Sequence, residues 1–194
     1  LASGIASASP AGLAYSSESF EVQRADTRFP GSATHPFLVR YGDEIRSGDD
    51  LVRIEGIQGA AVLMDRGSVV RWHSPGRIAM EKGGMAVALE QDALVDLTES
   101  GLRLRTLEAG NGASPAGLAV AAYEPNRVEI HNNGRMIAVE TLPGGNQVAV
   151  LGNQDALRLV RDALGNWRPE NVLPLSQFQG DPTEEDEDSD RGFF

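Results

Sequence analysis

The chain contains no cysteine, and this absence excludes a disulfide framework, a thiolate zinc site, an iron–sulfur cluster and a cysteine nucleophile. It also contains no apolar run close to the roughly 20 residues that a membrane-spanning helix needs, so we expect no transmembrane segment of its own. Basic residues are few, with 17 Lys and Arg against 28 Asp and Glu and a net charge of -11. Because Lys and Arg supply most nucleic-acid affinity by displacing counterions, we expect no nucleic-acid partner.

Motifs for catalysis and cofactor binding are also missing from the sequence. The histidines, His35, His73 and His131, lie far apart and beside turn residues, which gives no metal-ligand spacing. No G-x-S-x-G serine motif is present, and the glycines at 110–112 and 144–145 do not precede a helix that could cradle phosphate. The sequence therefore predicts a protein that is not an enzyme and uses no cofactor or metal.

Residues 19–152 have the pattern of one all-β domain, an antiparallel β-sandwich or barrel-like body. Short apolar runs alternate with turn residues at the spacing of roughly 8–12 residues that is typical of such folds. The segment Leu102–Arg105 alternates apolar and charged side chains, so it should place one face on a core and the other in water. The expected strands are Ser19–Ala25, Phe37–Tyr41, Asp50–Ile54, Gly59–Met64, Ser68–His73, Arg77–Met80, Met85–Glu90, Ala93–Leu97, Leu102–Leu107, Leu118–Tyr123, Arg127–His131, Arg135–Glu140 and Gln147–Leu151.

Turn residues suggest how these strands are connected. Asn133-Gly134 favours the positive φ angles of a type I′ turn and predicts a hairpin of 127–131 with 135–140. Pro143-Gly144-Gly145 predicts a turn to the next strand, which would complete a three-stranded meander. Asp65-Arg66-Gly67 and Lys82-Gly83-Gly84 are expected to form similar turns earlier in the chain.

Region 153–180 is expected to begin with one short C-terminal helix. Its apolar residues fall at i, i+3, i+4, i+7 and i+8, the spacing of an amphipathic helix. Asn153 can cap the start and Gly165 can end the helix. The residues of this apolar stripe are Ala156, Leu159, Val160, Ala163 and Leu164.

The rest of region 153–180 predicts an extended docking segment. Pro169 and Pro174 interrupt any regular period, and the apolar side chains between and around them need a surface to cover. That surface belongs either to the protein's own domain or to other protein subunits of an assembly, and in an assembly we expect Trp167 and Phe178 to be the main anchors. The candidate partner-binding residues are Trp167, Val172, Leu173, Leu175 and Phe178.

Both ends of the chain differ in composition from the body. Residues 1–18 are rich in Ala, Ser and Gly and predict a flexible or extended arm, although Ala6-Ser7-Ala8 also has the A-x-A form of an export-signal remnant. Residues 181–194 form an acidic tail, with seven acidic residues between Asp181 and Asp190. Such a run solvates the protein, or else the run or the terminal Phe193-Phe194 docks on a basic or apolar surface of a partner.

The region of about residues 42–80 resembles the FecR-type extracytoplasmic β domain. The resemblance rests on Gly42-Asp43-Glu44-Ile45, Gly48-Asp49-Asp50-Leu51, Gly59–Met64, Asp65–Val70 and Ser74-Pro75. These residues are similar to that family's G-D turn, small-residue strand, D-G-S turn and following strand. The resemblance implies a secreted or periplasmic, ligand-free β-sandwich that works through contacts.

Three roles are compatible with these patterns. The favoured one is a non-catalytic structural or accessory subunit of a larger cell-envelope or membrane-associated assembly, acting through protein–protein contacts. An alternative is a carbohydrate or small-ligand binding β module, with Trp72, Tyr41, Tyr123 and Trp167 as platforms. A virion decoration or tail protein is a further alternative, because it would share a β body with extended segments.

Overall fold

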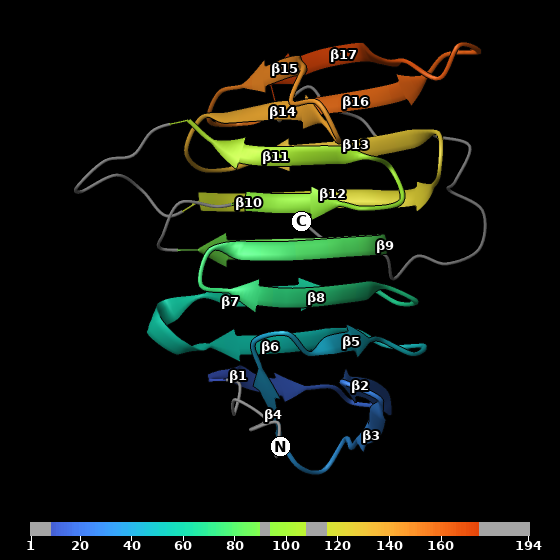
Figure 1. Cartoon of the computed structure of the whole chain (residues 1–194). Coiled ribbons are helices and arrows are strands. Elements are labelled where there is room, and N and C mark those ends of the chain that lie inside the picture. The colour runs from blue at the N-terminus through green and yellow to red at the C-terminus, as the bar shows by residue number, and fades with distance from the viewer. Residues whose placement is uncertain (1–8, 90–93, 108–115, 175–194) are drawn as a thin grey trace, which may run out of the picture.

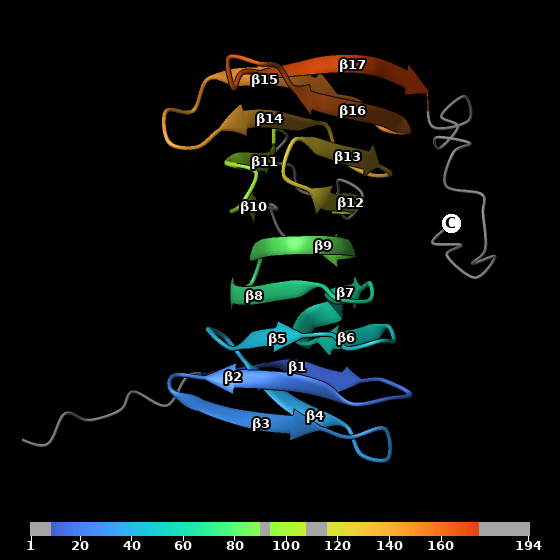
Figure 2. The ribbon, with the colours of Figure 1, turned by 90° about the vertical axis from the view of Figure 1, so that its right-hand side faces the viewer.

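The protein is an all-β sandwich-like body whose strands stack along one axis, from the N-terminal to the C-terminal part of the chain (Figure 1). The computed structural model describes residues 9–89, 94–107 and 116–174. Strand pairing within these residues divides the strands into two sheets, which we call sheet A and sheet B and which form the two layers in Figure 2. Neither sheet closes into a barrel. The predicted antiparallel all-β fold is confirmed.

The two sheets have the same layout. In sheet A the order is β4 (Phe37–Arg40), β1 (Pro10–Tyr15), β6 (Val52–Gly56), β7 (Ala61–Met64), β9 (Arg77–Leu89), β12 (Ala116–Glu124), β13 (Arg127–Asn132), β16 (Asp155–Arg161) and β17 (Trp167–Pro174). In sheet B it is β3 (Thr27–Gly31), β2 (Phe20–Arg24), β5 (Glu44–Arg46), β8 (Val69–Ser74), β9, β10 (Leu94–Leu97), β11 (Leu102–Thr106), β14 (Ile137–Thr141) and β15 (Gln147–Leu151). All pairs are antiparallel except β9 with β10.

Strand β9 belongs to both sheets. Its first part pairs with β8 in sheet B, and its second part pairs with β7 and β12 in sheet A. The change of sheet occurs at Gly83, whose φ of 96° lies in the region that favours glycine. A Cβ at Gly83 would lie 2.3 Å from the Ser68 hydroxyl oxygen. The prediction that Lys82-Gly83-Gly84 forms a turn was therefore wrong, because the glycines let one strand cross between layers.

Most consecutive hairpins lie in different sheets, and the strands of the predicted meander are divided between the two sheets in this way. β13 lies in sheet A and β14 in sheet B, so Asn133-Gly134 connects two layers and closes no hairpin. Gly134 is not among the glycines with positive φ. Instead the Asn132 side-chain amide donates to the carbonyls of Arg135 (2.9 Å) and Gly152 (2.7 Å), which stabilises the crossover. The turn at Pro143-Gly144-Gly145 is confirmed, since it joins β14 to β15 within one sheet.

The predicted helix in region 153–180 is a strand. Residues Asp155–Arg161 form β16, paired with β13 on one side and β17 on the other. Leu157 and Leu159 are fully buried, so the period of 2 in Leu157-Arg158-Leu159 prevailed over the coincident helical spacing. Gly165, expected to end a helix, has a φ of 84° in the turn between β16 and β17.

Part of the predicted N-terminal arm also belongs to the body. Residues 10–15 form β1, which lies between β4 and β6 in sheet A. Ala11 and Ala14 are fully buried, and a Cβ at Gly12 would meet the Glu55 carbonyl oxygen at 2.3 Å. The small side chains that indicated a flexible arm are the ones that fit into this closely packed position. Residues 1–8 lie outside the described residues.

The core fills the space between the two sheets. It includes large, fully buried side chains from both layers, such as Ile54 and Ile130 of sheet A and Trp72 and Leu104 of sheet B. Apolar burial of this extent is the main stabilising contribution to such a fold. No helix in the described ranges is long and apolar enough to cross a membrane.

Candidate interaction surface

A row of polar side chains runs across the outer face of sheet B. Strand register places these residues side by side, one from each strand in turn, in the order Arg28, Gln23, Glu44, Arg71, Ala79, Asp96, Arg103, Glu140 and Gln147. Neighbours in this cross-strand row lie on the same face of the sheet, where opposite charges stabilise strand pairing. Acids and arginines adjoin repeatedly along the row, with Ala79 near its middle.

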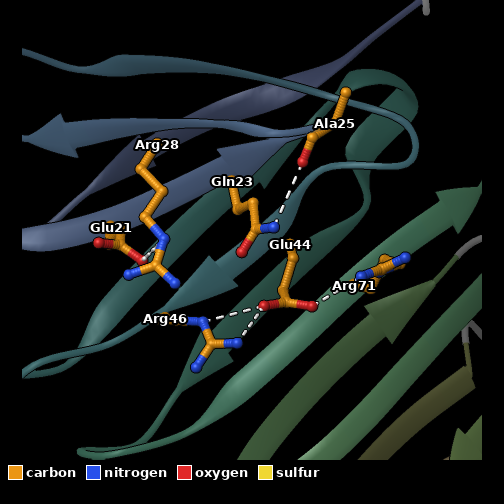
Figure 3. A network of polar contacts seen from close by, with 7 residues as sticks. All are labelled: Glu21, Gln23, Ala25, Arg28, Glu44, Arg46 and Arg71. Carbon is orange, nitrogen blue, oxygen red and sulfur yellow. Dashed lines mark hydrogen bonds and ion pairs between the residues drawn. The ribbon is translucent and has the colours of Figure 1, made fainter.

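Glu44 is the centre of the first charged cluster (Figure 3). Its carboxylate accepts hydrogen bonds from Arg46 at 2.6 Å and from Arg71 at 2.7 Å. Burial alone raises the pKa of Glu44, but the bonds from Arg71 and Arg46 outweigh it and hold that pKa below its usual value. Glu44 is therefore a charged carboxylate at neutral pH, held between two guanidinium groups.

Asp96 is the centre of a second cluster on the same face. Arg103 donates to both of its carboxylate oxygens, at 2.6 and 3.1 Å, and Arg77 reaches it at 3.4 Å. Burial raises the pKa of Asp96, and the hydrogen bonds and charges of Arg103 and Arg77 lower it further than burial raises it. Beyond this cluster, Arg105 pairs with Glu140. The same arrangement, one carboxylate between two arginines, thus occurs twice on this face, and it also occurs in sheet A, where Glu129 pairs with Arg127 and Arg158.

The acids and the arginines differ in their depth. The side chains of Glu44 and Asp96 are each 10% exposed, whereas those of Arg46, Arg71, Arg77 and Arg105 are 42–50% exposed. We call these four residues the arginine rim. The carboxylates thus lie near the sheet and the guanidinium groups lie above them. Solvent or a partner approaching sheet B meets arginine first.

A shallow hollow of about 310 Å³ lies between the two clusters. Ala79 forms part of its floor, because its short side chain leaves space between Arg71 and Asp96 in the row. Burial and the positive charges of Arg77 and Arg71 lower the pKa of His73, which also lines the hollow. The lining residues are Glu44, Val69, Arg71, His73, Ala79, Glu81 and Thr98.

The predicted partner-binding residues lie partly in the body. Trp167, Val172 and Leu173 belong to β17, the last strand of sheet A. The Trp167 indole packs against the core, donates to the Ser100 carbonyl at 3.0 Å and lies 4.6 Å from the Arg161 guanidinium. Trp167 therefore contributes to its own domain, while its role in partner binding stays a prediction, as does that of Val172 and Leu173.

The other two predicted residues, Leu175 and Phe178, lie outside the described residues. The acidic tail, residues 181–194, lies outside them as well. Their contribution to partner binding is also a prediction.

Three of the four proposed aromatic platforms, Trp72, Tyr41 and Trp167, pack in or against the core. Trp72 is 1% exposed, its indole N–H donates to the Ser74 carbonyl, and Tyr41 packs edge-on against its ring. Trp72 therefore belongs to the core and cannot stack on a sugar, so its assignment as a platform was wrong. Trp167, as described above, also packs against the core.

Clusters suited to metal binding are absent from the part of the chain that the structure describes, since no three His, Asp or Glu side chains come together there. No known protein-family model matches the chain, and no curated protein matches it.

Proposed function

We propose that the chain is a non-catalytic structural or accessory subunit of a cell-envelope assembly, which acts through protein–protein contacts. The observation that carries the proposal is the arginine rim, because it presents positive charge on one face of a protein whose net charge is -11. Arginine is enriched in protein interfaces, since its planar guanidinium can donate several hydrogen bonds at once.

The shape of the body also supports a role as a subunit. Each strand adds about 4.8 Å along the stack, so each sheet extends for roughly 40 Å. Both layers share a continuous core, which makes the body a rigid support for side chains on its outer faces. The resemblance of residues 42–80 to the FecR-type domain supports the cell-envelope location.

The chemistry of the rim indicates an acidic partner surface. Arg71 uses one terminal nitrogen on Glu44, and Arg77 makes one long contact with Asp96, so each guanidinium keeps N–H groups that can turn outward. Carboxylates of a partner can accept these bonds without displacing Glu44 or Asp96. Such contacts accelerate association and weaken as salt rises.

The proposal is tested with the double variant Arg71→Gln, Arg77→Gln. Glu44 keeps Arg46 and Asp96 keeps Arg103, so neither carboxylate loses all its partners. The matched control is Arg53→Gln, since Arg53 is an exposed arginine that pairs with Glu55 in sheet A, at 3.0 Å. The measurement is co-purification from the envelope fraction of the native source, at low and high salt.

We expect a protein that co-purifies in fixed ratio with the wild-type chain and the Arg53→Gln control, and that is lost with the double variant. Thermal unfolding of both variants reports whether the body remains intact. Retention of the partner by a folded double variant would overturn the rim as the interface. The absence of any protein in fixed ratio would contradict the subunit role itself.

A further inference from the structure

The outer face of sheet B carries more positive than negative charge, which is unusual for this chain. Its negative side chains are Glu21, Glu44, Glu81, Asp96 and Glu140, and its positive ones are Arg28, Arg46, Arg71, Lys82, Arg77, Arg103 and Arg105. Among the described residues of its strands, the face therefore has seven positive and five negative side chains, a net charge of +2. Two of the negative groups, Glu44 and Asp96, are also the least exposed.

The same chain contains a segment of opposite charge. Seven acidic residues lie between Asp181 and Asp190, and Arg191 is the one basic residue after Arg168. The described body ends at Pro174 in β17, at one end of the strand stack. The 16 residues 175–190 can reach at most about 53–58 Å when extended, which exceeds the roughly 40 Å length of a sheet. The acidic residues can therefore reach the rim from where the body ends.

We propose that residues 181–190 dock on the arginine rim of the same chain, so that an acidic partner binds there by displacing them. The consequence for a partner rests on the proposed function, whereas the docking itself does not. The pairing joins carboxylates of the segment to the outward N–H groups of Arg71, Arg77 and Arg105. Because these contacts are exposed, they are individually weak and depend on salt.

Lys82 provides a specific reporter of this docking. It is the single lysine of the sequence, it is exposed, and it lies in register with Val69, which lines the hollow. A water-soluble carbodiimide joins an amine to a carboxylate without a spacer. Treating the full chain with this reagent should therefore join Lys82 to an acidic residue of 181–190, as read by mass spectrometry of the digested monomer.

We expect this cross-link at low salt, with a yield reduced at least about fivefold in 0.5 M NaCl, where screening shortens the range of charge interactions. The Lys82→Arg variant keeps the charge and should lose the cross-link. A monomer in which Lys82 is joined to no residue of 181–190 would overturn the docking, and so would a link found in dimers alone.

A binding measurement tests the rim directly. The probe is a synthetic peptide of residues 179–194, and the protein is the full chain with its acidic residues neutralised. The substitutions are Asp181→Asn, Glu184→Gln, Glu185→Gln, Asp186→Asn, Glu187→Gln, Asp188→Asn and Asp190→Asn. We expect the peptide to bind this neutralised chain at least about fivefold more tightly than the wild-type chain, whose own segment occupies the rim.

Adding Arg71→Gln and Arg77→Gln to the neutralised chain should weaken peptide binding by about tenfold, while adding Arg53→Gln should leave it unchanged. A peptide with the seven acidic residues amidated should not bind, which is a control that needs no protein variant. Equal binding to the neutralised and wild-type chains, or to the rim variant and its control, would overturn the proposal.

Failure of this docking is distinct from failure of the proposed function. Without docking, the cross-link and peptide binding are absent, yet an envelope partner still depends on Arg71 and Arg77. Without the proposed function, no partner co-purifies, yet the cross-link and the peptide binding remain.

Discussion

The outer faces of the two sheets differ although their inner faces share one core. In sheet B the cross-strand row consists mainly of charged residues, from Arg28 to Gln147. The row at the centre of sheet A consists of Leu63, Ala86, Ala119, His131 and Ala156, which carry one titratable group among them. The inner faces must supply apolar volume, whereas the outer faces are free to vary. Their difference is the basis of our proposal that a partner binds to sheet B.

Strand β9 changes from sheet B to sheet A at Gly83 and so connects the two layers. Of the substitutions considered, Gly83→Ala should lower the free energy of unfolding the most. The new Cβ would collide with Ser68 at 2.3 Å and would hold alanine at positive φ. We expect destabilisation of about 2–5 kcal/mol in a urea titration. The control is Gly67→Ala, since Gly67 has positive φ but a Cβ added there would meet no atom within 4 Å, and about 1–2 kcal/mol is expected. Equal effects would contradict the crossing described for Gly83.

Removing the poorly exposed carboxylate of Asp96 in sheet B should lower the free energy of unfolding more than removing the exposed carboxylate of Glu55 in sheet A. Asp96→Ala leaves Arg77 and Arg103 without their shared partner, and we expect a loss of about 1–3 kcal/mol. Glu55→Ala removes the exposed partner of Arg53 in sheet A, and the expected loss is below about 1 kcal/mol. Chemical denaturation of both variants measures the difference. Similar losses would show that the charged row adds no more stability than an ordinary surface pair.

Acid should weaken the charged row. The folded-state pKa values of Glu44 and Asp96 are lowered, so their contribution is present above the unfolded-state pKa of about 4 and is lost as pH falls through the folded-state values. The double variant Glu44→Gln, Asp96→Asn should therefore lose less stability than the wild type between about pH 5 and pH 2. Thermal unfolding across this range is the measurement, and parallel pH profiles would contradict the expectation.

The smallest change in the free energy of unfolding is expected for Arg46→Gln. Glu44 keeps its bond from Arg71 at 2.7 Å, and Arg46 is 42% exposed. The change in the free energy of unfolding should be within about 0.5–1 kcal/mol. A loss as large as that of Asp96→Ala would mean that both arginines of a cluster are needed to hold its carboxylate.

Local patterns predicted most strands but few of their connections. The alternation in Leu102–Arg105 correctly indicated a half-buried strand, because burial on one face imposes a period of 2. Asn133-Gly134 has the composition of a hairpin turn, yet β13 and β14 lie in different sheets. Turn composition reports local backbone preference, whereas the choice of layer depends on strands far away in the sequence.

The charged row was beyond prediction for the same reason. Spacing of two, as in Glu44 and Arg46 or in Arg103 and Arg105, indicates side chains on one face of a strand. It does not indicate that Arg71 lies beside Glu44 or that Arg103 lies beside Asp96, since that depends on strand order and register. The error at β16 is related, because Leu159 fits the helical spacing with Ala156 and the strand period with Leu157 at once.

Strand β9 also has a kinetic consequence. Among the described residues, no strand of β1–β8 pairs directly with a strand of β10–β17, whereas β9 pairs with β7 and β8 on one side and with β10 and β12 on the other. Each half otherwise pairs within itself, mostly between strands near in sequence, and such local contacts close quickly. The chain is thus organised as two blocks that both need one strand to complete them. The backbone amides of β9 should exchange with solvent last, because they are released when both blocks have opened.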